Sequence, residues 1–319
     1  MEKCKLAIIG PGVIAHKFAD ACTRIEQVEL VAVASTNMER AKSFADKYDI
    51  PNAYDDYDEM LEQDIDGVYV SVINFKHLEV IEQCAKHGKA ILCEKPAVEN
   101  YEDAKKMAEC IRKYNVLFVE AMWTNFLPCI RKVKEWVDSG IIGKIRNIQV
   151  NMSFLGNPDP QSRLFNKELG GGGLLDVGIY TLAFALEMMG EPVVQSKSFM
   201  QIGETGVDEY AHTLLSFPSG TIASCSYGIR LNKPDHAFIY GEEGHINLPN
   251  FWRTRKCEVV NNKGEVIDTV EDECDNGFVY EIQHFVQLIQ EHKLESPINT
   301  IEKTLSYYKL IDEIRVESE

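Results

Sequence analysis

Two segments of the sequence hold side chains whose types suit proton exchange. The first is Glu94-Lys95-Pro96, which follows a short apolar run and places a lysine at the end of a predicted strand. The second is a run of four glycines, 170–173, that leads into an apolar helical pattern holding Asp176 and Tyr180. Residues at this spacing lie on one face of a helix. A phenol can act as a general acid or base when a nearby cation lowers its pKa.

Each of these residues also has a plain structural interpretation. Tyr180 suits a core aromatic residue with a hydrogen-bonded hydroxyl, and Lys95 suits a surface position before a turn-forming proline. Asp176 suits a helix cap after the glycines. Both interpretations stay open for each residue at this point.

A third segment has the spacing of a phosphate-binding turn. Gly10-Pro11-Gly12-Val13-Ile14-Ala15 follows a strand-like run and opens a helical pattern. Gly10 permits a tight turn, Gly12 lets the backbone approach a pyrophosphate, and Ala15 allows close packing of the helix on the strand. The pattern predicts a dinucleotide site, with these expected contacts: Gly10, Pro11, Gly12, Val13 and Ile14.

The end of the second predicted strand bears on the choice between NAD and NADP. An acidic residue there would accept hydrogen bonds from a ribose hydroxyl, whereas polar and basic side chains suit a 2′-phosphate. The segment has Ser35, Thr36 and Asn37, with no acid at the strand end, and Arg40 follows one helical turn later. These residues favour NADP over NAD, although Arg40 is almost equally suited to an exposed helix position.

Strands and helices alternate in residues 1–120, which predicts a Rossmann domain with a doubly wound parallel sheet. The near-continuous apolar runs indicate strands buried on both faces. The predicted strands are Lys5–Ile9, Leu30–Ala34, Gly67–Ser71, Ala90–Cys93 and Val116–Val119. Helical patterns lie between them at Met38–Tyr48, Phe75–His87 and Asn100–Tyr114, the last with Asn100 as its expected N-cap.

Residues 121–319 follow a different pattern, which predicts an α+β domain with a large, mostly antiparallel open sheet. Pro218-Ser219-Gly220 is a turn signal between the alternating runs Asp208–Phe217 and Thr221–Tyr227, and predicts a hairpin. Other expected strands are Ile145–Phe154, His236–Tyr240, His245–Leu248 and Glu258–Val260. Expected helices are Ile130–Ser139, Val279–Glu291 and Ile301–Ile314.

The composition of the chain limits its expected binding partners and its expected cellular compartment. The chain has 33 basic and 50 acidic residues, a formal charge of −17, which disfavours nucleic acid and anionic membrane surfaces. No uninterrupted apolar run approaches the ~20 residues of a membrane span, and the N-terminus has no secretory pattern. The nine cysteines are scattered and no metal-ligand spacing is present. We therefore expect free thiols, no metal and a cytoplasmic location.

Four motifs in their order along the chain resemble the glucose–fructose oxidoreductase / inositol dehydrogenase (Gfo/Idh/MocA) family. They are the Gly10–Ala15 turn, Glu94-Lys95-Pro96, Glu120-Ala121-Met122-Trp123 and the glycine-rich run that ends at Tyr180. The resemblance covers essentially the whole chain. Most members have a histidine where Tyr180 stands, and the tyrosine is similar to the branch with the dimeric dihydrodiol dehydrogenases.

The resemblance implies an NAD(P)-dependent oxidoreductase that acts on a sugar, polyol or cyclic dihydrodiol. It implies that Tyr180 exchanges the proton, that Lys95 lowers its pKa, and that Asp176 orients a neighbouring group. It also implies a homodimer or homotetramer formed through the sheet of the second domain. Two other functions stay open: a catalytically silent nicotinamide-binding sensor and an NAD-dependent glycosidase on the same fold.

The resemblance also suggests further contact residues on both domains. Beside the nicotinamide cofactor they are Asn74, His77, Glu94 and Lys95. Around the substrate they are Trp123, Phe154, Arg163 and Asn166. Phe165 is a further aromatic candidate, and ordinary core packing suits each aromatic residue equally well.

Overall fold

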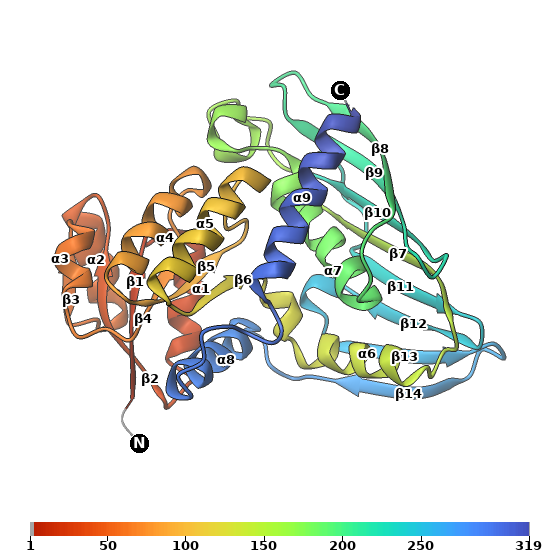
Figure 1. Ribbon diagram of the computed structural model, residues 1–319, viewed down its shortest axis with the longest axis horizontal. Helices are drawn as coiled ribbons and strands as arrows, with labels where there is room; N and C mark the ends of the chain where they lie inside the picture. The colour runs from red at the N-terminus through yellow and green to blue at the C-terminus, as the bar shows by residue number, and fades with distance from the viewer. Residues whose placement is uncertain (1–2, 319) are drawn as a thin grey trace. The chain divides into compact units, whose positions relative to one another are not determined.

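The computed structural model describes residues 3–318, and the chain divides into two compact units (Figure 1). One unit comprises residues 1–123 and 276–308, and the other comprises residues 124–275 and 309–319. The sequence placed a single boundary after residue 120. The segment 276–308 instead packs with the first unit, a long-range association that no local pattern indicates.

The first unit contains a six-stranded parallel sheet with the order β3-β2-β1-β4-β5-β6. This is the strand order of a doubly wound dinucleotide-binding fold and confirms the predicted fold class of this part. Its strands are β1 Cys4–Ile9, β2 Val28–Ala34, β3 Asn52–Tyr54, β4 Gly67–Val70, β5 Ala90–Glu94 and β6 Phe118–Ala121. The short edge strand β3 was missed because its three residues form no apolar run.

Helices connect the strands of this sheet. They are α1 Val13–Cys22, α2 Met38–Tyr48, α3 Tyr57–Leu61, α4 His77–Lys86 and α5 Tyr101–Tyr114, and α8 Phe278–Gln290 also belongs to this unit. α4 packs against α5, and α1 packs against α8. Asn100 caps α5 as predicted, since its side chain accepts a hydrogen bond from the Asp103 N–H at 2.9 Å. The Phe75–His87 pattern is a 3₁₀ turn, Asn74–Lys76, followed by α4.

The second unit contains an eight-stranded sheet with the order β14-β13-β12-β11-β7-β10-β9-β8. All described neighbours pair antiparallel except β7 and β10, so the mostly antiparallel prediction is confirmed. Its strands are β7 Ile145–Ser153, β8 Gln195–Ile202, β9 Asp208–Ser216, β10 Ile222–Gly228, β11 His236–Gly241, β12 Gly244–Pro249, β13 Lys256–Asn261 and β14 Val266–Glu271. β9 and β10 form the hairpin that Pro218-Ser219-Gly220 predicted.

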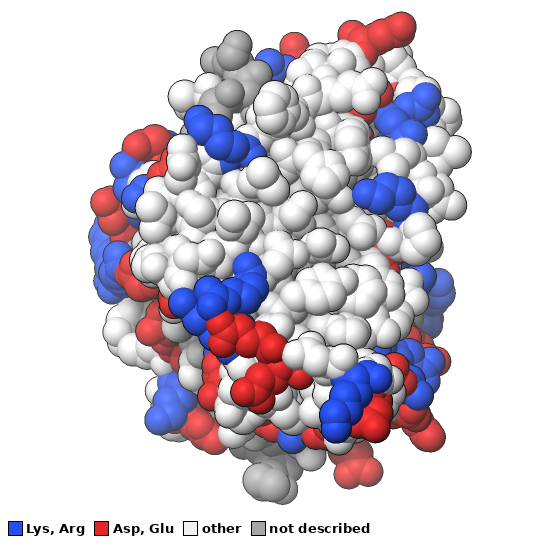
Figure 2. All heavy atoms as spheres, turned by 90° about the vertical axis from the view of Figure 1, so that its right-hand side faces the viewer, with Lys and Arg blue, Asp and Glu red and all other residues white. Residues whose placement is uncertain are grey.

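One face of this sheet is covered by α6 Pro128–Ser139 and α7 Ile179–Met189. The final helix, α9 Ile301–Ser318, is shared between the two units along the chain. The opposite face of the sheet is open (Figure 2). Along β9 the exposure alternates as a one-sided sheet requires, with Ala211 and Thr213 buried and His212 and Leu214 exposed.

The stretch Lys167–Met189 has the length and mean hydropathy, 1.5, of a membrane-spanning helix. This stretch was not predicted from the sequence, because charged residues such as Asp176 and Glu187 interrupt its apolar residues. Within the second unit 72% of its most apolar window is buried, and α7 within it contacts β7 and β10. It therefore packs as the core helix of this unit.

Candidate functional site

The turn after β1 allows a ligand to come close to the backbone. Gly10 has a φ of +93°, and a Cβ there would lie 2.7 Å from the Val72 nitrogen. Ser71 holds the two loops together by donating from its hydroxyl to the Gly10 carbonyl oxygen at 2.9 Å. Gly12 forms the N-cap of α1, so free N–H groups of the helix start at this turn.

A surface pocket of about 380 Å³ lies at the end of β2 within the first unit. Its lining residues come from the Gly10 turn, α1 and α2: Pro11, His16, Asn37, Glu39, Arg40, Ser43, Phe44 and Lys47. Pro11, Asn37 and Arg40 were predicted from the sequence, whereas His16, Ser43 and Lys47 were not. Helical spacing from Arg40 would have indicated Ser43 and Lys47 on the same side of α2.

The other residues expected at the strand end have local roles. Asn37 caps α2 by accepting the Arg40 N–H at 2.9 Å. Ser35 is buried, and its hydroxyl accepts from the Asn37 N–H at 3.3 Å. Thr36 is exposed. Polar groups of Ser35 and Asn37 thus form hydrogen bonds within the turn. The positively charged side chains that line the pocket are those of Arg40 and Lys47.

A buried donor lies after β4. The Asn74 side chain is only 8% exposed, yet its Nδ2 has no hydrogen-bond partner within the protein. An unsatisfied buried amide N–H costs about 1–3 kcal/mol, which a bound acceptor would recover. Asn74 therefore fits a ligand contact, as the sequence suggested.

The end of β5 places Glu94 inside the first unit and Lys95 half-buried beside it. Glu94 accepts a hydrogen bond from the Tyr69 hydroxyl at 2.5 Å. Burial raises the pKa of Glu94, and the Tyr69 hydrogen bond and the Lys95 charge oppose that rise. Glu281 of α8 is fully buried near Glu94 with neither carboxyl oxygen hydrogen-bonded, and burial followed by the Glu94 charge raises its pKa well above the usual range.

Glu120, at the end of β6, fixes the chain that follows Lys95. One carboxyl oxygen accepts the Ala97 N–H at 3.0 Å and the Tyr308 hydroxyl at 2.6 Å, and the other accepts the Thr304 hydroxyl at 2.9 Å. Burial raises the pKa of Glu120, and these hydrogen bonds and the Lys95 charge lower it in part. The segment 276–308 thus reaches back to support the Lys95 loop.

His77 lies at the first position of α4 with its ring fully buried. Its Nδ1 is 2.8 Å from the Pro96 carbonyl oxygen, and its Nε2 is 2.9 Å from the Val72 carbonyl oxygen. The ring therefore bridges the loop after β4 and the loop after β5.

In the second unit, the glycine-rich run leads into a π-helical turn, Leu174–Gly178, and then into α7. Asp176 lies in the wide turn and Tyr180 in the helix, so the regular α-helical spacing expected from the sequence is interrupted. Asp208 anchors the start of the turn by accepting the Leu174 N–H at 2.6 Å. Burial raises the pKa of Asp208 to about 6, against the opposing backbone hydrogen bonds.

Glycines in the run and in the π-helical turn make room for their neighbours. A Cβ at Gly172 would lie 2.3 Å from an Asp208 carboxyl oxygen, and one at Gly178 would lie 3.1 Å from the Tyr227 ring. The close approach of Asp208 therefore depends on Gly172 in the run, and that of Tyr227 depends on Gly178, which follows Asp176.

Asp176 is paired with Arg163, whose guanidinium lies 2.9 Å from its carboxylate. Tyr180 is buried, and its ring centroid lies 6.3 Å from that of Trp252. Trp252 was missed by the sequence analysis, because the short 3₁₀ turn Phe251–Arg253 has no periodic pattern. The Trp252 indole donates to Asp235 at 2.8 Å, which fixes the plane of the ring.

The remaining aromatic and polar candidates are placed as follows. Trp123 lies in the first unit, and its ring stacks on Phe278 at 5.3 Å. Phe154 is half-buried and Phe165 fully buried, both in the second unit. Asn166 accepts the Glu168 N–H at 2.9 Å.

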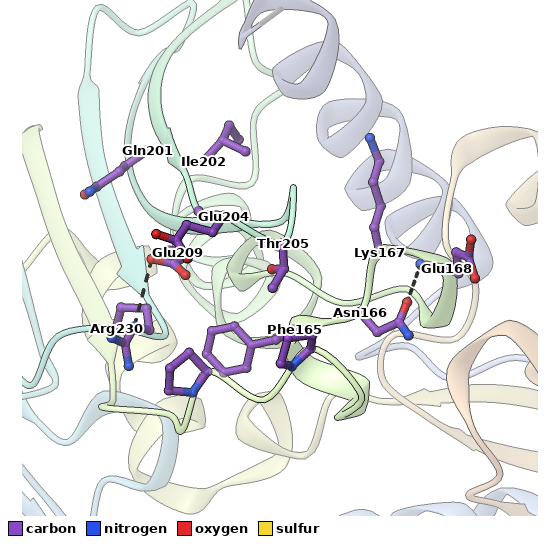
Figure 3. A pocket seen from close by; sticks show the side chains of 13 residues that line it. Phe165, Asn166, Lys167, Glu168, Gln201, Ile202, Glu204, Thr205, Glu209 and Arg230 are labelled. Carbon is purple, nitrogen blue, oxygen red and sulfur yellow. Dashed lines mark hydrogen bonds and ion pairs between the residues drawn. The ribbon is translucent and has the colours of Figure 1, made fainter.

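A cavity of about 1180 Å³ in the second unit lies between the loop before the glycines and the β8–β9 turn (Figure 3). Asn166 and Phe165 contribute to one wall, and Glu209 with Arg230, 3.9 Å apart, to another. Its lining thus offers hydrogen-bonding groups, with the buried Phe165 behind them.

Comparison with known families decides the assignment. The family model described as "Oxidoreductase family, NAD-binding Rossmann fold" matches residues 4–121, and the model of the GFO/IDH/MocA C-terminal domain matches residues 130–247. The chain belongs to the Gfo/Idh/MocA oxidoreductase family. The family resemblance drawn from the four motifs is therefore confirmed.

Members of the Gfo/Idh/MocA family with known names match this chain over nearly its full length. Trans-1,2-dihydrobenzene-1,2-diol dehydrogenase of Xenopus tropicalis is 32% identical over 97% of this chain and 96% of its own. The scyllo-inositol 2-dehydrogenase (NADP(+)) of Bacillus subtilis is 31% identical over 98% of this chain and 96% of its own.

Solved structures share the fold of this Gfo/Idh/MocA chain. Aldose-aldose oxidoreductase from Caulobacter crescentus superposes with a TM-score of 0.90 at 24% identity, over 99% of this chain and 98% of that chain. The 3-ketoreductase KijD10 from Actinomadura kijaniata, solved with NADP and TDP-benzene, has a TM-score of 0.88 at 22% identity with the same coverage.

This Gfo/Idh/MocA protein is an NAD(P)-dependent oxidoreductase, and its named relatives are dehydrogenases and reductases. The residues of the first unit fit such a cofactor. The Gly10 turn leaves no room for a side chain, Asn74 has an unused buried donor, and Arg40 and Lys47 line the adjacent pocket.

Proposed function

We propose that this enzyme transfers a hydride between NADP and a secondary alcohol or carbonyl carbon of a sugar, polyol or cyclic dihydrodiol. The observation that carries the proposal is the combination, in one Gfo/Idh/MocA chain, of the Gly10 cradle with a buried Tyr180 and with an Asp176 that is paired with Arg163. Two relatives of nearly equal length support the substrate class, since their names state a cyclic diol and an inositol.

The first unit holds the cofactor in this proposal. The backbone at Gly10 and Gly12 takes the pyrophosphate, Asn74 donates to the ribose or nicotinamide, and the cations Arg40 and Lys47 take the 2′-phosphate. The pocket holds two cations against one acid, Glu39, and the strand end itself has no acid, which supports NADP over NAD. When bound, the nicotinamide supplies or accepts the hydride.

Tyr180 serves as the general acid or base for the substrate oxygen. Its pKa must fall from ~10 toward neutrality, about three units or ~4 kcal/mol. One close cation lowers the pKa of a neighbouring group by about 1–3 units. We therefore propose that Lys95 lowers the pKa of Tyr180 and hydrogen-bonds the substrate oxygen. Asp176, held by Arg163, orients a neighbouring hydroxyl.

The substrate ring binds, in this proposal, among aromatic and polar side chains. Trp123, Phe154, Arg163 and Asn166 keep the role proposed from the sequence, and Trp252 joins them because its ring lies beside Tyr180. Flat apolar faces with a few fixed polar groups suit ring compounds that carry hydroxyls.

A substrate panel tests this function. Purified protein with NADP or NAD is mixed with sugars, inositols and trans-dihydrodiols, and the nicotinamide absorbance is followed. We expect reduction of NADP by at least one ring polyol or dihydrodiol. A glycosidase would release sugar with no net absorbance change, and a silent sensor would bind NADP but turn over none of the panel; either result contradicts the proposal.

We also propose that the enzyme forms a homodimer or homotetramer through the open face of the eight-stranded sheet. Figure 2 shows few charged side chains over the middle of this face, although the chain carries a net charge of −17. Phe199, Leu214 and Ile222 are 85%, 48% and 49% exposed there. A sparsely charged face that also exposes large apolar side chains suits a protein interface.

Light scattering after size-exclusion chromatography tests the assembly. We expect Leu214→Glu to yield monomers, because it buries a charge in the interface. Val316→Glu, on the exposed side of α9, is the matched control and should leave the assembly unchanged. A monomeric wild-type protein would refute the proposal.

The compartment we propose is the cytoplasm. All nine cysteines are free thiols in the structure, and seven of them are buried. A reducing compartment keeps such thiols free. Fractionation of the host cell would test this, with a secreted or periplasmic protein as the contrary result.

A further inference from the structure

The cavity of the second unit has more room than the single ring that the proposed function requires. Its volume is about 1180 Å³, whereas pockets that hold a drug-sized ligand have about 300–1000 Å³. A six-membered ring with hydroxyl groups is smaller than such a ligand. The cavity therefore has space for a further ring.

The cavity adjoins the turn that supports Asp176. Asn166, a proposed contact of the substrate ring, lines the cavity together with Phe165. Arg163, in the same 3₁₀ turn as Phe165, pairs with Asp176 at 2.9 Å. A part of the substrate that extends past Asn166 would therefore enter this cavity.

Two charged side chains are fixed on the wall away from Asn166, those of Glu209 and Arg230 (Figure 3). Arg230 donates from Nη1 to the Gly156 carbonyl oxygen at 2.9 Å, and its Nε lies 3.9 Å from the Glu209 carboxylate. Glu209 lies against Gly203, where a Cβ would overlap its carboxylate. The side chains of Glu209 and Arg230 stay 18% and 35% exposed, so they are held in place and can still contact a ligand.

This pair complements two neighbouring hydroxyl groups. A guanidinium only donates hydrogen bonds and a carboxylate only accepts them, whereas a hydroxyl group does both. One hydroxyl of a sugar ring can therefore accept from Arg230 while the adjacent hydroxyl donates to Glu209. Hydrogen bonds to charged groups are the stronger ones, so this arrangement favours a vicinal diol.

The charges around the cavity disfavour an anionic ligand. Its charged lining residues are the cations Lys167 and Arg230 and the acids Glu168, Glu204 and Glu209. A phosphate or nucleotide would be repelled by the excess of acids, whereas a neutral hydroxylated ring would not.

We propose that this cavity binds a second, neutral polyhydroxylated ring that is joined to the ring being oxidised, so that the enzyme takes disaccharides or other glycosides. Glu209 and Arg230 bind two neighbouring hydroxyls of the second ring. Oxidation of the first ring rests on the function proposed above. Binding of the second ring does not, and can be measured without any turnover.

Calorimetric titration of the full chain with glucose, cellobiose, maltose and lactose tests the binding. NADPH is kept saturating, so that the dinucleotide site is filled. We expect at least one disaccharide to bind at least about tenfold more tightly than glucose, since hydrogen bonds to charged groups contribute that much. Glu209→Gln should weaken that disaccharide at least about fivefold, because an amide oxygen accepts a weaker hydrogen bond than a carboxylate.

Glu258→Gln is the matched control. Glu258 is an ion-paired glutamate of the same sheet, 3.4 Å from Lys256, and does not line the cavity. This variant should keep the wild-type affinity for the disaccharide. If Glu209→Gln does not fold, Gln201→Trp, at an exposed lining position, narrows the cavity and should weaken the same disaccharide.

Three calorimetric results would overturn the inference. The first is an equal affinity for glucose and for all three disaccharides. The second is a Glu209→Gln protein that binds the disaccharide as wild type does. The third is UDP-glucose binding more tightly than every disaccharide with NADPH saturating, which would assign the cavity to a nucleotide instead of a neutral ring.

Kinetics separate this inference from the proposed function. For the best ring compound of the substrate panel and its glucoside, we expect the glucoside to have the higher kcat/KM, and Glu209→Gln to remove that difference. A glucoside that binds through Glu209 but is not oxidised, although its single ring is, would overturn the placement of the cavity beside the reacting ring. A panel in which nothing reduces NADP would refute the proposed function, and the calorimetry would still decide the binding site.

Discussion

Three glycine-to-alanine variants separate the backbone requirements of the dinucleotide turn from its role in binding. Gly88 and Gly10 both have positive φ, +68° and +93°, whereas Gly12 has a φ of −87° that any residue can adopt. A Cβ at Gly88 meets nothing within 4 Å, and one at Gly10 lies 2.7 Å from the Val72 nitrogen. At Gly12 the nearest atom, the Ser71 carbonyl oxygen, is 4.0 Å away.

These differences give an ordered set of stabilities. Gly88→Ala should cost about 1–2 kcal/mol in unfolding free energy, the price of a positive φ for an L-residue. Gly10→Ala adds a backbone clash, and overpacking of this kind costs about 1–3 kcal/mol more. Gly12→Ala should leave the unfolding free energy within about 1 kcal/mol of wild type, since it needs neither strain nor displacement.

Cofactor binding should follow a different order. Gly12→Ala places a methyl group where the pyrophosphate must approach, so the NADPH dissociation constant should rise at least tenfold, about 1.4 kcal/mol. Gly88→Ala, away from the turn, should bind NADPH as wild type does. Urea unfolding without cofactor and fluorescence titration with NADPH measure the two quantities. A Gly12→Ala protein with wild-type NADPH affinity would refute the assignment of this turn.

Further expectations concern single side chains. Arg40→Ala should raise the NADP dissociation constant by about 5–30-fold, since a partly exposed charged contact is worth ~1–2 kcal/mol. The affinity for NAD, which has no 2′-phosphate, should stay unchanged. An equal loss of affinity for both cofactors in isothermal titration would contradict the role given to Arg40. The pKa of Asp208 is raised to about 6, so wild-type unfolding free energy should fall as pH rises from about 4 to about 6, and Asp208→Asn should flatten that fall in urea unfolding. The pKa of Glu281 is raised by burial, so Glu281→Gln should increase stability more at about pH 8 than at about pH 5, and an equal effect at both would argue against a buried, unpaired carboxyl.

Local features were the ones that the sequence predicted well. The Gly10 turn, the Asn100 cap and the 218–220 hairpin each depend on residues within one short stretch, so their types and spacing were sufficient. The buried parallel strands were predicted for the same reason, because their two-faced burial gives an uninterrupted apolar run.

Features that depend on distant residues were missed. The side chains that line the pocket beside Arg40 come from two helices, and Trp252 lies beside Tyr180 from a segment more than seventy residues later. The return of segment 276–308 to the first unit rests on the contacts of Glu120 with Thr304 and Tyr308. Strand β8 was missed because its sequence does not alternate apolar inward and polar outward residues: Ser196 is buried, whereas Phe199 is 85% exposed. No local pattern encodes such contacts.

The central claim is that Tyr180 exchanges the proton that accompanies hydride transfer. Pre-steady-state nicotinamide absorbance, recorded for Tyr180→Phe with a substrate from the panel and with NADP saturating, tests it most directly. We expect the hydride-transfer rate to fall by about 10²–10⁴, the usual contribution of general acid–base catalysis, with NADP affinity unchanged. A Tyr180→Phe enzyme that transfers hydride at the wild-type rate would contradict the account.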